Sequence, residues 1–289
     1  MLLRYLAARL RYRDPASARF LRGGLAIEAR ARRLRKHWTP HQERSKAAQR
    51  RWAEETSGID LAVLGPGRLY DFAGDALPAR FRRLLMVDAD PSSVPYWREL
   101  GVEVEPRVAD LTGHSERWRA ALARYRGGWP QTLDYIRSIV KPGDEPHAFA
   151  ADAVLSLNVL SQLPIGWQDC VEEYLVRRFG ARHVKANERE WLDAVEPGAE
   201  LIVRQHLHAL AASGARSILL ITDVEYADSH GDGTTELSPA LYGVDPAQEL
   251  AGYTLRWQDS WRWDISPAGA ESPECGTAHH VTAFAFARR

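Results

Sequence analysis

Cysteine and long hydrophobic runs are scarce in this chain, and its charges sum to zero. Cys170 and Cys275 are the two cysteines among 289 residues. So few cysteines exclude a disulfide framework and indicate a reducing, cytoplasmic location. No apolar run approaches the roughly 20 residues of a membrane-spanning helix, so we predict no membrane span. A formal net charge of zero argues against binding to nucleic acid or membrane through charge alone.

Charge is nevertheless distributed unevenly along the chain. Residues 1–53 carry 15 Lys/Arg and three acids, and the remaining residues carry a matching excess of acids. Apolar residues recur in this basic stretch at helical spacing. We therefore predict a basic helical segment over 1–56, followed by one larger domain over 57–289. The segment could form a lid over a ligand pocket, or it could pack through its leucines and leave a solvated basic face.

Three signals predict where these N-terminal helices begin and end. Asp14-Pro15 should break the first helix, and Gly23-Gly24 is expected to break the next. Thr39-Pro40 should start another, because threonine is a favourable N-cap and proline suits the first helical position.

The stretch 59–110 carries the clearest ligand-binding pattern. Three apolar runs each end at a glycine turn or an acid: Ile59–Leu64 before Gly65-Pro66-Gly67, Leu84–Val87 before Asp88, and Val102–Ala109 before Asp110. Such runs are typical of parallel strands, whose carboxyl ends converge on the crevice where ligands bind. Glycine lets a ligand approach the backbone closely, and acids can accept hydrogen bonds from ribose hydroxyls or from an amine.

Two common nucleotide-binding motifs are absent. The dinucleotide fingerprint requires a third glycine where this chain has Tyr70, and no Gly-Lys-Ser/Thr run is present for a P-loop. A Gly-x-Gly turn followed by two strand-end acids instead resembles the class I S-adenosylmethionine-dependent methyltransferases. The resemblance covers roughly Ile59 to the C-terminus.

This resemblance implies a role for each ligand-binding residue. Gly65 and Gly67 would lie near the methionine moiety of S-adenosylmethionine, Asp88 would bind its ribose, and Asp110 would lie on the adenine side. A helix over Tyr70–Ala76 is expected to follow the turn. Each acid could instead serve only as a helix cap or turn residue.

A fourth apolar run, Asp152–Leu157, leads into Asn158 and Gln162. In the resembled family this strand end lies beside the transferable methyl group, so we expect Asn158 to contact the cofactor. Asn158 and Gln162 can each donate and accept hydrogen bonds. Either could orient a nucleophilic substrate, or both could merely fix the turn. The Asn-Pro-Pro-aromatic run that indicates amino-group methylation of nucleic acid or protein is absent.

Two further polar groups are candidates for catalysis. Asp223 follows a fifth apolar run, Arg216–Thr222, where it could align a substrate. His206 lies in a predicted helix over Glu188–Ala212 and could act as a general base or be structural. We predict no metal site, because His206 and His208 are two residues apart, whereas neighbours on a helix face are three or four apart.

The C-terminal part of the chain predicts how the sheet closes. Aromatic and β-branched runs at Tyr253–Ile265 and His279–Ala287 favour an antiparallel hairpin. Strands and helices alternate before it, which indicates an α/β, Rossmann-like fold. We predict a mostly parallel seven-stranded sheet with this C-terminal antiparallel hairpin, preceded by the N-terminal helical segment.

The resemblance implies that the chain transfers a methyl group from S-adenosylmethionine to an oxygen, nitrogen or sulfur nucleophile of a small molecule or peptide. Two alternatives stay open. One is an RNA methyltransferase that uses the N-terminal arginines on phosphates, and the other is a non-catalytic protein of the same fold. The sequence leaves the methyl acceptor and the oligomeric state open.

Overall fold

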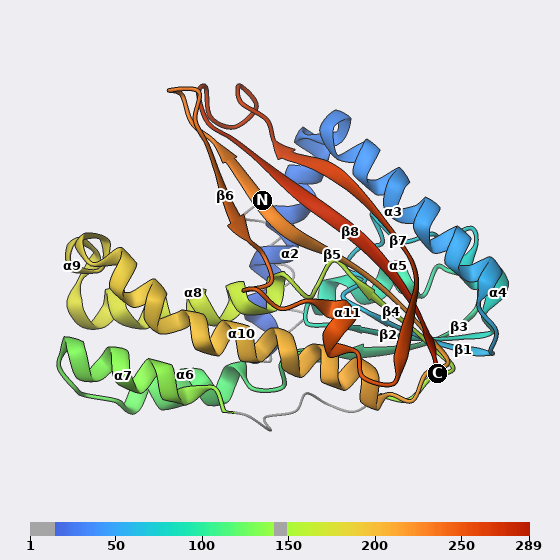
Figure 1. Cartoon of the computed structure of the whole chain (residues 1–289), viewed down its shortest axis with the longest axis horizontal. Coiled ribbons are helices and arrows are strands. Elements are labelled where there is room, and N and C mark those ends of the chain that lie inside the picture. The colour runs from blue at the N-terminus through green and yellow to red at the C-terminus, as the bar shows by residue number, and fades with distance from the viewer. Residues whose placement is uncertain (1–14, 142–148) are drawn as a thin grey trace.

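A computed structural model describes residues 15–141 and 149–289 (Figure 1). The helix expected before Asp14 lies outside these residues. In the described part of the chain, no helix is both long enough and apolar enough to cross a membrane.

One sheet organises the described residues. Its strands are β1 (Asp60–Leu64), β2 (Arg83–Asp88), β3 (Glu103–Val108), β4 (Ala153–Leu157), β5 (Ser217–Ser229), β6 (Thr235–Pro239), β7 (Tyr253–Ser266) and β8 (Gly276–Arg288). They are ordered β3-β2-β1-β4-β5-β8-β7, and β6 pairs with the second half of β5. Strands β1 to β5 are parallel, whereas β8 runs antiparallel between β5 and β7. The predicted α/β fold with a mostly parallel sheet and a closing hairpin is confirmed.

The sheet also contains a strand that the sequence did not predict. β6 is mostly exposed and polar, so it lacks the apolar pattern of the other strands. Strand β5 was expected to end at Thr222, but it continues to Ser229. Strands β6 and β8 both pair with this additional part of β5.

Strand β3 forms one edge of the sheet and carries charged side chains. Glu103, Glu105 and Arg107 alternate along it, and Arg83 of β2 forms an ion pair with Glu105 at 2.6 Å. Pro106 lies within the strand, opposite Met86 of β2.

Helices cover both faces of the sheet. The first face carries α3 (Arg35–Glu55), α4 (Leu77–Arg80) and α5 (Val94–Trp97), and the second carries α10 (Glu188–Ala212) and α11 (Pro246–Glu249). Trp52 of α3 is 1% exposed and belongs to the same core cluster as Leu61 and Leu84 of the sheet. The predicted N-terminal segment therefore contributes directly to the main core.

Further helices form a layer that projects from the sheet (left in Figure 1). They are α6 (Ser115–Arg124), α7 (Trp129–Ile139), α8 (Gln162–Phe179) and α9 (Ala181–Ala186). Helices α7, α8 and α9 pack with α10, and α6 packs on α7 and α8. Three buried tryptophans, Trp118, Trp167 and Trp191, anchor this layer in a core cluster of its own. The short α9 was not predicted, and α8 begins at the first residue after the turn that follows β4.

The helix break predicted at Gly23-Gly24 and the helix start predicted at Thr39-Pro40 are wrong. α2 (Pro15–Arg33) runs through Gly23-Gly24. Gly24 is needed there for close packing, since a Cβ atom at this position would lie 1.9 Å from Asp90 Oδ2. α3 begins at Arg35 and contains Pro40 inside it, so Thr39 is no N-cap. The Thr39 hydroxyl instead donates to the Arg35 carbonyl within the helix, at 2.8 Å.

The helix predicted over Tyr70–Ala76 does not form. The main chain there is held by α3, because Gln49 donates to the Asp71 carbonyl at 2.6 Å and accepts from the Ala73 N–H at 2.9 Å. These tertiary hydrogen bonds replace the bonds of a local helix, and they leave the Asp71 side chain free to enter the polar network after β4.

Candidate active site

The turn after β1 brings two glycines to the carboxyl end of the sheet. Both have positive φ, 73° at Gly65 and 47° at Gly67, which favours glycine. A Cβ atom on Gly65 would lie 2.5 Å from Val159 Cβ, so Gly65 lets the turn pack against the segment after β4. A Cβ atom on Gly67 would have no atom within 4 Å. Gly67 is therefore the glycine that leaves room beside the backbone.

Asp88 ends β2 and joins this turn. Its Oδ2 accepts from the Gly67 N–H at 2.9 Å and its Oδ1 accepts from the Asp90 N–H at 2.8 Å. Burial raises the pKa of Asp88 from 3.8 to about 6, because it disfavours the ionised form more than these hydrogen bonds favour it. The structure thus places the predicted ribose-binding acid against the predicted glycine turn.

The raised pKa of Asp88 predicts a pH-dependent stability. The folded chain keeps a proton on Asp88 over a range, from 3.8 to about 6, in which the unfolded chain releases it. The stabilisation from this proton is complete below the pKa of Asp88 in the unfolded chain. It is lost as the pH rises through the pKa of Asp88 in the folded chain. Relative to wild type, Asp88→Asn should therefore gain up to about 3 kcal/mol of unfolding free energy between about pH 4 and pH 7. Urea unfolding of both proteins at each pH measures this gain, and a constant difference would contradict the assignment.

A buried polar network lies at the end of β4. Asn158 has a positive φ of 50° and is 7% exposed. Its Nδ2 donates to Asp71 Oδ2 at 2.8 Å, and Nε2 of His41 lies 3.5 Å from the same oxygen. The Trp261 indole N–H donates to Nδ1 of His41 at 3.0 Å, and Nε2 of His41 lies 3.2 Å from Asn158 Nδ2. The ring of His41 stacks on Trp263, with centroids 3.9 Å apart.

This network contains two hydrogen-bond acceptors, the Asp71 carboxylate and the Asn158 amide oxygen. Burial alone would raise the pKa of Asp71, but the facing His41 and the hydrogen bond from Asn158 lower it below 3.8, so the carboxylate is ionised at neutral pH. The Asp71 side chain keeps 21% of its surface exposed. Asn158 Oδ1 is buried, and within the described residues it has no hydrogen-bond partner. A carboxylate beside an unpartnered carbonyl oxygen is suited to a positively charged hydrogen-bond donor.

A second polar group surrounds Asp223 within β5. The Ser161 hydroxyl donates to Asp223 Oδ2 at 2.8 Å, and His279 Nδ1 of β8 lies 3.2 Å from the same oxygen. Asp223 is 3% exposed, and no hydrogen bond to its Oδ1 occurs in the part of the chain that is described. Burial and then the Asp223 carboxylate raise the pKa of Tyr226, so this phenol stays protonated. The ring of Trp263 lies between His41 and His279 and connects the two groups.

The other predicted site residues lie elsewhere. Gln162 is exposed in the first turn of α8. His206 is buried on the face of the sheet opposite to α3 and His41, where its Nε2 lies 3.0 Å from Ser156 Oγ. Burial lowers the pKa of His206 to about 4. The carboxylate of Asp110 accepts hydrogen bonds from the N–H groups of Thr112 and Ser115, as a helix cap does. The cofactor and catalytic roles of these three residues stay predictions.

A small cavity lies on the side where adenine is expected. Asp110, Leu111, Phe149 and His206 are among its lining residues. His206 therefore borders the predicted adenine side, away from the polar groups around Asp223.

Four residues of the site were missed as site residues in the sequence analysis: His41, Asp71, Trp263 and His279. His41 lies in the middle of a basic helix, and its partners come from segments far away in the sequence. His279 was noted only as the start of a strand. No local signal marks these residues, because their contacts form only in the folded chain and burial cannot be read from a single sequence.

Comparison with known proteins finds similar folds among solved structures. No protein-family model matches the chain, and no curated protein matches it. Among solved structures, TehB from Haemophilus influenzae is 9% identical with a TM-score of 0.43, over 82% of this chain and 60% of that chain. A TehB-like SAM-dependent methyltransferase from Corynebacterium glutamicum is 14% identical with a TM-score of 0.35, over 84% and 88% of the two chains. M. jannaschii TYW2, in complex with AdoMet, is 11% identical with a TM-score of 0.33, over 85% and 77%.

Proposed function

We propose that this chain binds S-adenosylmethionine and transfers its methyl group to an oxygen, nitrogen or sulfur nucleophile of a small molecule or peptide. The observation that carries the proposal is the convergence at the carboxyl ends of β1, β2 and β4 and at Asp223 within β5. A glycine turn, two acids and two buried acceptors without partners meet there. Ligands of open α/β sheets bind at this edge.

The residues around the glycine turn fit the cofactor. Gly67 leaves space beside its backbone for the methionine moiety, and the Asp88 carboxylate can accept from ribose hydroxyls. The ionised Asp71 and the free Oδ1 of Asn158 are suited to the ammonium group of the methionine moiety. When bound, S-adenosylmethionine supplies a methyl group on a positively charged sulfur.

The residues around Asp223 are proposed to hold the acceptor. Transfer to an activated methyl group depends chiefly on alignment of the nucleophile, at about 3–3.5 Å from the carbon. His279 Nδ1 lies 3.2 Å from Asp223 Oδ2, and among the described residues it makes no hydrogen bond. A proton held on Nδ1 beside this carboxylate would leave Nε2 to accept a proton from the nucleophile. Tyr226, as a neutral phenol, donates a hydrogen bond and does not act as a base.

The N-terminal helices are proposed to cover the cofactor. Glu28 of α2 forms a buried ion pair with Arg68 of the glycine turn, and Arg68 Nη2 donates to Ser92 Oγ after β2 at 2.9 Å. α2 therefore lies over the loops that follow β1 and β2, as a lid would.

Calorimetric titration with S-adenosylmethionine and, separately, with NAD tests the cofactor assignment. We expect micromolar affinity for S-adenosylmethionine and none for NAD, because the third glycine of the dinucleotide motif is replaced by Tyr70. An absence of S-adenosylmethionine binding would overturn the proposed function.

The acceptor side is tested with a panel of small nucleophiles, by following release of S-adenosylhomocysteine. For any acceptor that turns over, His279→Ala should lower kcat by about 10²–10⁴-fold and leave the cofactor Kd unchanged. An unchanged kcat would remove His279 from the proton transfer.

A further inference from the structure

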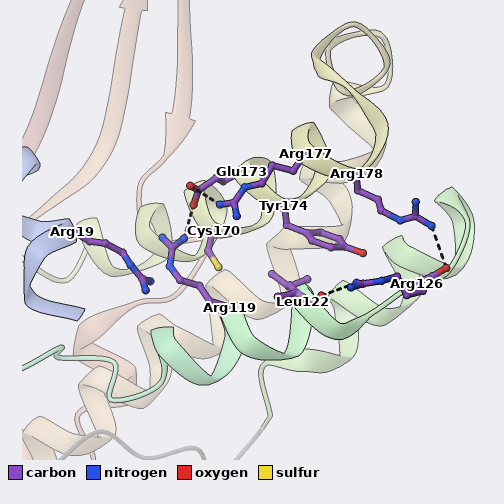
Figure 2. Close-up of a pocket in the computed structure, with 10 residues that line it drawn as sticks. Arg19, Arg119, Leu122, Arg126, Cys170, Glu173, Tyr174, Arg177 and Arg178 are labelled. Atoms are coloured by element: carbon purple, nitrogen blue, oxygen red, sulfur yellow. Dashed lines mark hydrogen bonds and ion pairs between the residues drawn. The ribbon is translucent and has the colours of Figure 1, made fainter. Parts of the chain in front are cut away.

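A groove outside the candidate active site is lined mainly by arginine (Figure 2). Helices α2, α6 and α8 form its walls, and its volume is about 490 Å³. Its charged lining residues are Arg19, Arg119, Arg126, Arg177 and Arg178, together with the single acid Glu173. Arg19 forms an ion pair with Glu116 beside the groove, at 2.7 Å. The other four arginines still outnumber the single acid of the lining, although the whole chain has a formal net charge of zero.

Glu173 is shared between two of these arginines. Arg119 Nη1 lies 2.5 Å from Glu173 Oε2, and Arg177 Nη2 lies 2.6 Å from Glu173 Oε1. Arg119 Nε is buried and, among the described residues, has no hydrogen-bond partner. One carboxylate thus serves two guanidinium groups, and the Nε–H donor of Arg119 is left without a partner among the described residues.

The far end of the groove has no acid. Arg126 Nη1 donates only to main-chain carbonyls, those of Ala123 at 2.6 Å and Tyr125 at 2.8 Å. Arg178 Nη2 donates to the Arg126 carbonyl at 3.3 Å, and Figure 2 shows both side chains at this end. Over residues 15–141 and 149–289, neither guanidinium has a carboxylate oxygen within 4.0 Å. Two like charges at one place favour an anion between them.

The floor of the groove is apolar and uncharged. Leu122 and Cys170 are buried there, and the ring of Tyr174 lies between the two arginine-rich ends. Burial raises the pKa of Cys170 to about 11, so its thiol is neutral and does not repel an anion.

We propose that this groove binds a small molecule that carries two or more phosphate groups. Guanidinium groups match phosphate oxygens with paired hydrogen bonds. Arg119 lies in α6, whereas Arg126 follows the end of that helix. Figure 2 shows the two side chains toward different ends of the groove, which allows separate phosphates there. The volume lies within the range of about 300–1,000 Å³ for small-molecule sites.

A nucleic-acid strand fits less well. The carboxylate of Glu173 interrupts the positive track that a continuous phosphate backbone would follow. Phosphate binding in this groove does not depend on methyl transfer, so the two proposals can be tested separately.

Calorimetric titration of the full chain with inorganic tripolyphosphate, at an ionic strength of about 0.05 M so that charges are little screened, tests the proposal. The double variant Arg126→Ala/Arg178→Ala should weaken binding at least tenfold. Glu173→Gln should tighten it severalfold, because it removes a competing carboxylate. The matched control is Arg137→Ala on α7, an arginine paired with Asp134 outside the groove, and it should bind as wild type does. All four side chains are substantially exposed, so thermal unfolding should confirm folded variants.

Three results would overturn the proposal. The first is no binding by wild type, and the second is binding that the double variant and the Arg137→Ala control weaken equally. The third is tighter binding of a short single-stranded oligonucleotide than of tripolyphosphate, with an oligonucleotide affinity that falls steeply as the salt concentration rises. That last result would indicate a nucleic-acid backbone as the ligand.

Discussion

Asp71→Asn should weaken S-adenosylmethionine binding by about 30-fold or more. The carboxylate of Asp71 is ionised, largely buried and fixed by Asn158 Nδ2 at 2.8 Å. Loss of one partner of a buried, hydrogen-bonded charge pair costs about 2–5 kcal/mol, and the proposed partner is the ammonium group of the cofactor. Calorimetric titration measures the change directly.

The same segment offers a matched control. Asp75 lies four residues further on, is exposed and forms a surface ion pair with Arg50 at 2.9 Å. Asp75→Asn removes the same charge at a place that does not face the crevice, so its cofactor affinity should equal that of wild type. If the two variants bind equally well, Asp71 does not contact the cofactor.

Trp52→Ala should lower the free energy of unfolding by about 3–5 kcal/mol, as expected for loss of a fully buried tryptophan. Trp52 packs on Phe81, and its indole N–H donates to Ser217 Oγ of β5 at 2.7 Å. It therefore joins α3 to a central strand. Urea unfolding measures the loss, and Trp52→Phe should cost less because it keeps most of the ring volume.

The number of unfolding transitions in the same experiment tests the boundary predicted between 56 and 57. If α3 belongs to the main core, tryptophan fluorescence and far-ultraviolet circular dichroism should follow one shared transition in wild type. Two separate transitions would instead indicate that the N-terminal segment unfolds as an independent lid.

The parallel strands could be predicted because their signals are local. β1, β2 and β4 are nearly continuous apolar runs, since both of their faces are buried, and each is followed by a turn or an acid. The positions of Gly67 and Asp88 at one edge followed directly from this sheet.

The polar network could not be predicted because its bonds join distant segments. Asn158 meets Asp71 across 87 residues, and Trp261 meets His41 across 220. The helix predicted over Tyr70–Ala76 failed for the same reason, since side chains of α3 bind its main chain. From its neighbours in the sequence Gly24 was expected to break a helix. In the fold it allows close packing of α2 against Asp90, which belongs to another segment.

The charged edge strand β3 has a consequence for self-association. A sheet can grow by pairing its last strand with a strand of another molecule, and amyloid-like aggregation uses this route. Pro106 has no N–H to donate to an incoming strand, and burial of Glu103, Glu105 and Arg107 against a neighbour would remove their charges from water. The outer edge at β3 therefore opposes intermolecular strand pairing, which favours the folded chain remaining dispersed at high concentration.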